Sequence, residues 1–287
     1  FDAGHDVSGP LKMNATFSTI NDDACEAFAT LGAVCLRNVF TDWVEILRAG
    51  VERNHDEPGP YFAENVTAED EGRFWDDYCN WQRIPEFHRF ITESSAAQLA
   101  ALIMRSKTAQ FFHDHVLVKE PNTSKPTPWH QDAPYYFADG TQTVSFWLPL
   151  DAVSKAETLR LVAASHRWPK LVLPVKWLDD ADFYDAQSDQ YMTLPELDDA
   201  HCEESILEWE MQPGDAVLFD FRTVHGARGN FQDHRRRAFS MRWVGDDGHY
   251  TERPGRTSPP YPGHDMIDGQ KLREDWFPVL WPRVSRN

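Results

Sequence analysis

Cysteine is scarce in this chain, and the few cysteines follow no recognisable spacing. There are four, none of them in a CxxC pair, at Cys25, Cys35, Cys79 and Cys202. Isolated thiols of this kind usually fill small apolar positions in a core. Nothing in the cysteine pattern demands an oxidising compartment, and we expect a cytoplasmic protein.

Long apolar runs are absent as well. No run approaches the roughly 18 apolar residues that a membrane-spanning helix needs, and the mean hydropathy is −0.57. Residues 1–6 lack the basic and apolar segments of a signal peptide, so we expect no such peptide. These observations argue against a membrane protein.

Basic residues are outnumbered by acidic ones. The chain has 28 Lys and Arg against 46 Asp and Glu, a formal net charge of −18. A protein so negative repels phosphate backbones, which makes nucleic acids and anionic membranes poor partners. Twelve of the acids lie within residues 179–210, a span without Lys or Arg. We expect a solvated surface insertion there rather than a lid over a site.

The chain does contain enough apolar material for a sizeable core, since 41% of its 287 residues are hydrophobic and 13% are aromatic. Its first part shows helical patterns, such as an apolar face that Asn21 would cap and Gly32 would end. The expected organisation is a single domain over residues 1–287, with a helical N-terminal part at about 20–107, a strand-rich core at 108–245, an insertion at 166–205 within that core, and an irregular tail at 246–287.

About eight strands with turn signals between them are expected after the helical part. We place them at 109–119, 129–132, 143–150, 159–163, 206–211, 216–219, 224–227 and 238–244. Helices followed by a run of strands predict a mainly β fold with flanking helices, in which the core is a double-stranded β-helix, the jelly roll of cupin-like proteins. Such a core suits a metal site, because inward side chains from several strands converge.

The stretch Trp129–Asp132 carries the strongest chemical signal. On an extended strand His130 and Asp132 would point to the same side, because side chains alternate with period two. One imidazole and one carboxylate on one face are two of the three ligands in the 2-His-1-carboxylate triad of non-haem iron(II) oxygenases. A lone His-x-Asp pair is weak evidence, since each residue by itself is more often structural.

A second stretch, about a hundred residues later, strengthens this interpretation. After the turn Pro213–Asp215 comes His225, which supplies the missing imidazole, and then the basic run Arg235–Arg237. An arginine there can grip a dicarboxylate cosubstrate through two charge-assisted hydrogen bonds. Three protein ligands on one face of iron leave three positions open for a chelating keto acid and O₂.

Other polar and aromatic residues allow two interpretations. His113 and His115 also share a strand face, but no third ligand is evident beside them, so we interpret both as structural, as we do His166. The aromatic stretch 74–81 is more typical of a core than of a substrate wall. Residues 135–137, Tyr-Tyr-Phe, either wall a substrate site or simply pack.

In combination and order these motifs resemble the phytanoyl-CoA dioxygenase family of Fe(II)/2-oxoglutarate oxygenases. The resemblance covers roughly residues 20–245 and rests on Trp129–Asp132, Phe146–Trp147, Ala164–His166, Pro213–Asp215, His225–Gly226 and Arg236–Ser240. It implies that His130, Asp132 and His225 bind Fe(II), with 2-oxoglutarate as cosubstrate and O₂ as oxidant.

The resemblance also implies a set of cosubstrate-binding residues. Arg236, eleven residues after the second histidine, would bind the far carboxylate of 2-oxoglutarate, and Ser240 on the same strand face would assist. Trp147 matches a position that lines the cosubstrate site, and Lys119 matches a lysine often found before the His-x-Asp strand. If the strand register is off by one residue, Arg237 takes the role of Arg236.

The implied reaction is oxidative decarboxylation of 2-oxoglutarate to succinate and CO₂, coupled to hydroxylation of a small organic substrate. Asp132 favours hydroxylation, because related halogenases lack this carboxylate; desaturation and ring chemistry stay open as alternative outcomes. The chain departs from the family where a glycine is usual, reading Glu157–Thr158 and Ala164 instead. These departures concern pocket shape, and hence the substrate, rather than the metal ligands. The sequence identifies neither the substrate nor the oligomeric state.

Two alternatives stay open at this stage. A cupin-type metalloenzyme could use the same barrel without 2-oxoglutarate, although Arg236 argues against it. A non-catalytic binding protein could retain the fold, although the intact triad argues against that.

Overall fold

Helices come mainly from the first part of the chain. The computed structural model describes residues 16–66, 72–184, 189, 191–197 and 206–283. Within them the helices are α1 (Asp22–Leu31), α2 (Val44–Asp56), α3 (Pro85–Glu93) and α4 (Ala96–Ile103), with 3-10 turns η1 (Thr41–Trp43), η2 (Ala133–Tyr135) and η3 (Ser165–Arg167). Helix α1 begins and ends as predicted: the Asn21 side chain accepts a hydrogen bond from the Ala24 amide at 2.9 Å, and Gly32 adopts a left-handed conformation with φ 82°.

A large sheet spans the middle of the molecule. Its strands run in the order β1 (Thr16–Phe17), β2 (Ala33–Leu36), β13 (Ala216–Phe219), β8 (Thr143–Pro149), β15 (Arg236–Val244), β5 (Ala109–Lys119), β4 (Phe74–Tyr78) and β3 (Ala63–Glu64), with β17 (Val279–Trp281) also paired to β5. The aromatic stretch that begins at Phe74 is therefore a strand of this sheet. The sheet includes a strand from the start of the described chain, β1, and one from its end, β17.

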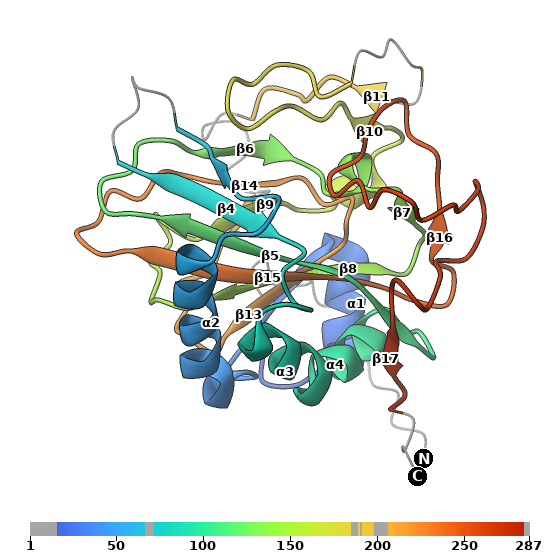
Figure 1. The fold of residues 1–287 in the computed structure, drawn as a ribbon, viewed down its shortest axis with the longest axis horizontal. Coiled ribbons are helices and arrows are strands. Elements are labelled where there is room, and N and C mark those ends of the chain that lie inside the picture. Colours follow the sequence, from blue (N-terminus) through green and yellow to red (C-terminus); the bar gives the residue numbers. More distant parts are fainter. Residues whose placement is uncertain (1–15, 67–71, 185–188, 190, 198–205, 284–287) are drawn as a thin grey trace, which may run out of the picture.

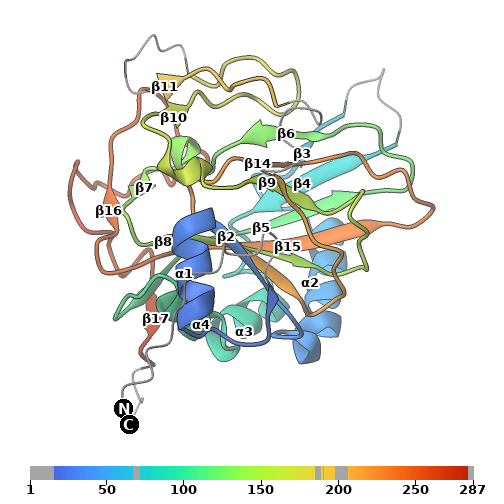
Figure 2. The same cartoon turned by 180° about the vertical axis from the view of Figure 1, so that it is seen from behind.

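A smaller sheet lies across from the large one. Its order is β12 (Ile206–Leu207), β9 (Leu159–Val162), β14 (His225–Ala227) and β6 (Thr127–His130). Two further strand pairs are β10 (Leu171–Val172) with β11 (Tyr191–Met192), and β7 (Ala138–Asp139) with β16 (His249–Tyr250). The helices cover one face of the large sheet and the small sheet covers the other (Figures 1 and 2). This arrangement confirms the predicted fold class, a mainly β chain with flanking helices around a jelly-roll core.

Strand β15 shows how one sheet serves both a core and a site. Phe239 and Trp243 point toward the helices, where Phe239 packs on Phe87 with ring centroids 4.7 Å apart. The alternate residues Arg236 and Ser240 point to the opposite face and line a cavity beneath the small sheet. The alternation of strand side chains thus places apolar residues in the core and polar residues in the barrel interior.

A β-bulge shifts this alternation on the neighbouring strand. In the β5–β15 pair Arg242 lies opposite His113, whereas the next residue, Trp243, lies opposite Phe111, so Phe112 is the extra residue. Phe111 packs in the helix-side core while His113 lines a cavity on the other face. Bulges redirect side chains in this way and are common beside active sites.

The strand predicted at 129–132 ends earlier than expected. Strand β6 stops at His130, and Asp132 has helical dihedrals (φ −70°, ψ −43°) as it enters turn η2. Pro134 in that turn has no amide hydrogen to donate, which disfavours continuing the sheet. The prediction that His130 and Asp132 share an extended strand is therefore wrong. Strand β12 is also shorter than the predicted 206–211.

The cysteines of the described residues are free thiols. Cys25 and Cys35 are buried, as predicted, and burial raises the pKa of Cys35 to about 12. Cys79 is half-buried and its thiol donates to the Tyr261 hydroxyl at 3.2 Å. Cys202 lies outside the described residues.

Candidate metal and cosubstrate site

The predicted triad residues converge at the small sheet. His225 of β14 lies directly opposite His130 of β6 in the antiparallel register, which brings their rings to a centroid distance of 4.2 Å. Asp132 Oδ1 lies 4.0 Å from His130 Nε2 and 3.9 Å from His225 Nε2. One potential ligand atom from each residue falls within 4.8 Å of the others. Cross-strand pairing thus joins residues that are far apart in the sequence.

Backbone carbonyls fix the tautomers of both histidines. His130 Nδ1 donates to the Pro128 carbonyl at 2.8 Å, and His225 Nδ1 donates to the Thr223 carbonyl at 2.9 Å. A carbonyl can only accept, so each Nδ1 carries the hydrogen and each Nε2 keeps a free lone pair beside Asp132. Burial, reinforced by the neighbouring His225, lowers the pKa of His130 to about 3, and burial lowers that of His225 as well. Both rings are neutral, as metal ligands must be.

Asp132 is held as a buried anion by three side chains. Its Oδ2 accepts from the Ser145 hydroxyl at 2.6 Å, and its Oδ1 accepts from the Tyr136 hydroxyl at 3.0 Å. The Arg242 guanidinium lies 3.3 Å away. Burial by itself would raise the pKa of Asp132, but Arg242 and the two imidazoles hold it below its usual range. Two neutral imidazoles and one carboxylate form a donor set that fits non-haem iron(II).

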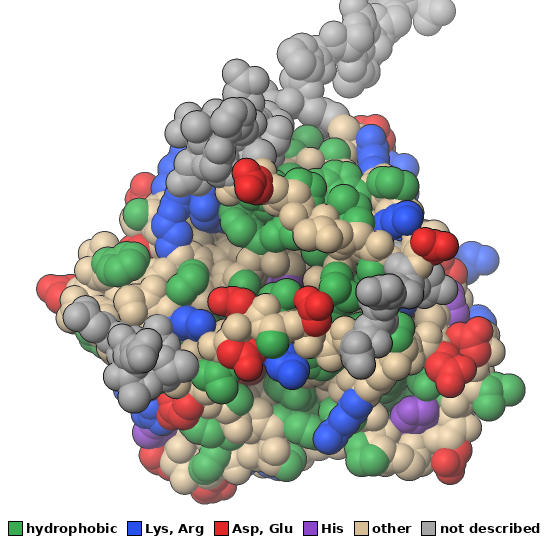
Figure 3. All heavy atoms as spheres, turned by 90° about the horizontal axis from the view of Figure 1, so that it is seen from above, with side chains coloured by type: hydrophobic (Ala, Val, Ile, Leu, Met, Phe, Trp, Pro, Cys, Tyr) green, Lys and Arg blue, Asp and Glu red, His purple; other side chains and the backbone are tan. Residues whose placement is uncertain are grey.

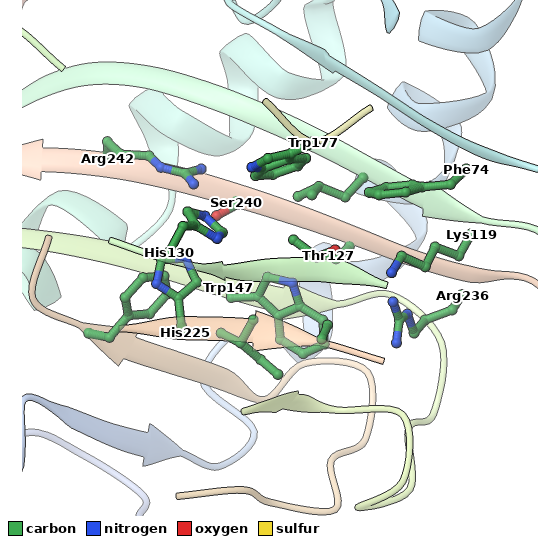
Figure 4. Close-up of a pocket in the computed structure, with 15 residues that line it drawn as sticks. Phe74, Lys119, Thr127, His130, Trp147, Trp177, His225, Arg236, Ser240 and Arg242 are labelled. Carbon is green, nitrogen blue, oxygen red and sulfur yellow. The ribbon is translucent and has the colours of Figure 1, made fainter. Parts of the chain in front are cut away.

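All four predicted cosubstrate residues line one cavity between the two sheets, together with both triad histidines. Figure 4 shows Lys119 and Arg236 at one end of this cavity, with His130 and His225 toward the other. Trp147 lies between these ends. Ser240 also lines the cavity, and its hydroxyl donates to the Phe146 carbonyl at 2.7 Å. The cavity therefore joins a metal-binding donor set to a cationic end.

Arg236 is a buried cation without a carboxylate partner among the described residues. Its Nη1 donates to the Glu157 carbonyl and its Nη2 to the Arg228 carbonyl at 3.4 Å. Burial lowers the pKa of Arg236 to about 10, which leaves it charged at neutral pH. A desolvated cation of this kind is stabilised by an incoming carboxylate.

The neighbouring Arg237 points away from the cavity. It donates to Asp151 at 2.7 Å and to Glu52 at 3.0 Å. The structure thus places Arg236, and not Arg237, in the position where the sequence expected a carboxylate-binding arginine.

Lys119 stands beside Arg236 at the cationic end. Its ammonium donates to the carbonyls of Lys125 at 2.9 Å and Arg228 at 3.0 Å, and lies 4.5 Å from the centre of the Phe74 ring. Burial, together with the charge of Arg236, lowers the pKa of Lys119 well below its usual value. The departure from the family pattern at Glu157 falls at this end, because its carbonyl holds Arg236.

Comparison with known proteins agrees with this geometry. The model of the phytanoyl-CoA dioxygenase (PhyH) family matches residues 28–238, well over half of the chain. The chain belongs to the phytanoyl-CoA dioxygenase family. This confirms the predicted family and the class of enzyme, a non-haem iron enzyme that uses 2-oxoglutarate. Comparison with the curated proteins gives no match.

Solved structures share the fold at low sequence identity. SnoK, a non-heme alpha ketoglutarate dependent carbocyclase from nogalamycin biosynthesis, is 22% identical with a TM-score of 0.69, covering 91% of this chain and 96% of its own. The epimerase SnoN, solved with Fe3+, alpha ketoglutarate and nogalamycin RO, is 20% identical with a TM-score of 0.70, covering 90% and 97%. EctD from S. alaskensis, solved with 2-oxoglutarate and 5-hydroxyectoine, is 18% identical with a TM-score of 0.62, covering 88% and 86%.

This PhyH-family chain has a second cavity, of about 300 Å³, which reaches the triad at His130 and Asp132. Its wall includes the aromatic residues Tyr78, Tyr135, Tyr136, Trp177 and Phe183 and the polar residues Asp76, His113, His115 and Arg242. His115 Nε2 lies 2.6 Å from Asp76 Oδ2. The interpretation of His113 and His115 as purely structural missed their position in this wall. Their period-two spacing with Lys119, on the same face of β5, is the signal that would have placed them there.

The described part of the insertion covers the second cavity. Val175, Trp177 and Phe183 line it, and the Tyr135 hydroxyl donates to the Val175 carbonyl at 2.5 Å while accepting from its amide at 2.9 Å. The Trp177 ring lies edge-on to His130, with centroids 5.1 Å apart. Of residues 179–210, which we expected to form a solvated surface insertion, Asp179, Asp180 and Asp182 are exposed as expected, whereas Phe183 lines the second cavity.

Gln131, between two triad residues, faces away from them and ties this region together. Its amide nitrogen donates to the Arg222 carbonyl at 2.5 Å, and its amide oxygen accepts from the Val172 amide at 2.8 Å. The loop before His225 and the start of the insertion are thus fixed to the same residue.

The helices of the described residues are all too short or too polar to span a membrane.

Proposed function

We propose that this enzyme hydroxylates a small organic substrate, with His130, Asp132 and His225 binding Fe(II) and Arg236 binding the far carboxylate of 2-oxoglutarate. One observation carries the proposal: a buried, unpaired guanidinium and a buried donor set that fits iron(II) lie in one cavity. When bound, iron and 2-oxoglutarate supply the oxidising chemistry and release succinate and CO₂.

The side chains of the chain would orient the cosubstrate and exclude water. Arg236 offers two parallel N–H groups to a carboxylate, a geometry that lysine lacks. Lys119 adds further N–H donors at the same end, and Trp147 and Ser240 line the cavity between that end and the histidines. Because the cationic end is buried, the carboxylate would be held in a medium where charge-assisted hydrogen bonds are strong.

The second cavity is our proposed substrate site. It borders the triad on the side away from Arg236 and is walled largely by aromatic rings. The SnoN and EctD structures contain small organic molecules, nogalamycin RO and 5-hydroxyectoine, which supports a small organic substrate here. On the face that carries β10 and β11, the visible Lys and Arg side chains are interspersed with acids (Figure 3), a distribution that gives polyphosphate ligands little support.

We further infer that one domain, over residues 1–287, carries this whole activity. Residues from Ala63 to Pro259 contribute to the two cavities, so the site draws on the N-terminal part, the strand core and the tail. The free thiols Cys25 and Cys35 support a cytoplasmic location.

An anaerobic titration of the apoprotein with Fe(II) and 2-oxoglutarate tests the proposed function. The weak visible charge-transfer band of the chelate should appear in the wild type. Arg236→Ala should weaken 2-oxoglutarate binding by roughly tenfold to a hundredfold, because a buried charge-assisted pair is worth roughly 1.5–3 kcal/mol.

Arg237→Ala is the matched control, since Arg237 lies next in the sequence but pairs with Asp151 and Glu52. It should bind 2-oxoglutarate as the wild type does. A protein that binds iron but never develops the band would contradict the proposed function and favour a cupin-type enzyme without this cosubstrate. Equal losses in both variants would contradict the role of Arg236.

A further inference from the structure

Two buried polar atoms in the wall of the second cavity have neither a hydrogen bond nor an ion pair among the described residues. They are His113 Nε2 and Arg242 Nη1. Arg242 Nε also lacks a hydrogen bond but is ion-paired with Asp132 at 3.3 Å. The side chains are almost fully buried, at 1% and 4% exposure. Buried polar atoms are nearly always hydrogen-bonded, so each such exception needs an explanation. Neither atom belongs to the iron-binding donor set.

The two side chains face the same space. His113 and Arg242 are directly opposite each other in the β5–β15 pair, so both side chains project from one face of the large sheet. Both contact the same ring: His113 lies 5.0 Å from Tyr136 between centroids, and the Arg242 guanidinium carbon lies 6.0 Å from it. Both also line the second cavity. Figure 4 shows the Arg242 guanidinium reaching from β15 toward His130.

The two unpartnered atoms have opposite hydrogen-bonding character. His113 Nδ1 donates to the Asp114 carbonyl at 3.1 Å, so Nδ1 carries the hydrogen and Nε2 is an acceptor. Arg242 Nη1 can only donate, and the rest of its guanidinium is engaged with Asp132. The cavity wall therefore offers one acceptor and one donor side by side, close to the triad.

We propose that the substrate is a neutral, ring-containing molecule bearing a hydroxyl group, and that this hydroxyl donates to His113 Nε2 while accepting from Arg242 Nη1. This inference rests on the proposed function, because it assigns the substrate class of the same site. A substrate hydroxyl can satisfy both atoms, because its one oxygen both donates and accepts. Aromatic residues Tyr78, Tyr135 and Trp177 supply flat apolar surface for the ring.

Other oxygen-bearing groups satisfy only half of this arrangement. A ketone or an ether accepts from Arg242 but leaves the His113 lone pair unpaired in a buried wall. A carboxylate would place its charge against that lone pair and close to the Asp132 anion. A site built to bond a hydroxyl strongly disfavours analogues that lack one, because its own buried groups then lose their partners.

Binding of three matched naphthalenes tests the proposal: 2-naphthol, 2-methoxynaphthalene and 2-naphthoate. Dissociation constants are measured by isothermal titration calorimetry under anaerobic conditions, both with and without Fe(II) and 2-oxoglutarate. The wild type should bind 2-naphthol roughly tenfold or more tightly than either analogue. His113→Phe, which keeps an aromatic ring but removes the acceptor, should reduce the preference over 2-methoxynaphthalene to less than about threefold.

His88→Phe is the matched control, because it makes the same substitution at an exposed histidine outside both cavities. It should leave the preference for 2-naphthol unchanged. The proposal is overturned if the wild type binds all three compounds alike, binds none of them, or keeps its full preference in His113→Phe. These outcomes are separate from failure of the proposed function, which appears as an absent chelate band whatever the naphthalenes do.

Discussion

At the residue scale, the candidate iron site depends on how Asp132 is held. The Ser145 hydroxyl donates to its Oδ2 at 2.6 Å, and both side chains are buried. Outer-shell partners of this kind orient ligands, and losing one typically costs tenfold to a hundredfold in metal affinity. We expect Ser145→Ala to weaken Fe(II) binding by about tenfold or more, as measured by anaerobic competition with a metal-binding dye.

Ser258→Ala is a suitable control, because Ser258 lines the second cavity but bonds Tyr78 rather than Asp132. Its Fe(II) affinity should match that of the wild type. Unchanged affinity in Ser145→Ala would show that Arg242 and Tyr136 orient the carboxylate without the serine.

His113 gives a second residue-scale prediction, on the pH dependence of stability. Burial, reinforced by Arg242, lowers its pKa well below 6.5, so the folded protein keeps this ring neutral. The unfolded chain binds a proton there below about pH 6.5, so the stability that the neutral ring contributes is present above that pH and lost below it. Between pH 7 and pH 5, wild-type apoprotein should lose roughly 2 kcal/mol more unfolding free energy than His113→Phe.

Urea denaturation of the apoprotein at the two pH values measures this difference. His88→Phe, at an exposed position, controls for the loss of a histidine and should follow the wild type. If His113→Phe shows the same pH dependence as the wild type, the folded protein must protonate His113, which would also remove the acceptor that the hydroxyl proposal requires.

At the scale of elements, the antiparallel pair β6–β14 brings the histidines together and Gln131 fixes that pair to its surroundings. Gln131 is 1% exposed, and its amide satisfies the buried Val172 amide and the Arg222 carbonyl. Gln131→Leu leaves both backbone groups without a partner. Because each unsatisfied group costs about 1–3 kcal/mol, we expect a loss of about 2 kcal/mol or more in unfolding free energy.

Urea denaturation again provides the measurement, with Gln82→Leu at an exposed helix-proximal position as the control. That control should change stability by less than about 0.5 kcal/mol. A Gln131→Leu variant as stable as the wild type would mean that the insertion and the Arg222 loop find other partners, and that Gln131 does not fix them.

Sequence patterns predicted the elements where local chemistry decides the outcome. The Asn21 cap and the Gly32 end of α1 follow from side-chain bonding and backbone freedom. The family resemblance, rather than local pattern, indicated Arg236, and regular alternation along β15 puts its side chain in the cavity. The strand through Asp132 was mispredicted because the chain leaves the sheet after His130 and turns into η2, a change that the His-x-Asp spacing does not signal.

The sequence did not reveal the roles of Arg242, His113 and Trp177. Arg242 meets His113 only through the cross-strand register, and a bulge at Phe112 puts Phe111 on the helix side although it is only two residues from His113. Trp177 reaches His130 from an insertion whose path depends on tertiary hydrogen bonds such as that of Tyr135. Register, bulges and loop docking depend on contacts between distant segments, which local pattern does not encode.

At the scale of the whole molecule, the helix layer and the site occupy opposite faces of the same sheet. The apolar residues of β15 hold the helices while its polar residues meet the small sheet, so the two layers that carry the triad come together only in the folded chain. A metal that binds this assembled donor set binds the folded state and stabilises it by mass action. At a concentration a hundred times its dissociation constant, Mn(II), a redox-stable substitute for Fe(II), should raise the Tm by roughly 5 °C.

Differential scanning fluorimetry with and without Mn(II) measures this shift, and a chelator should reverse it. His225→Ala removes one donor from the facing strand, so its Tm should respond to Mn(II) by less than about 1 °C even at the same concentration. Arg237→Ala keeps the donor set and should respond as the wild type does. An equal shift in His225→Ala would mean that the metal stabilises the fold from another place, and that the convergence of the two strands is not what binds it.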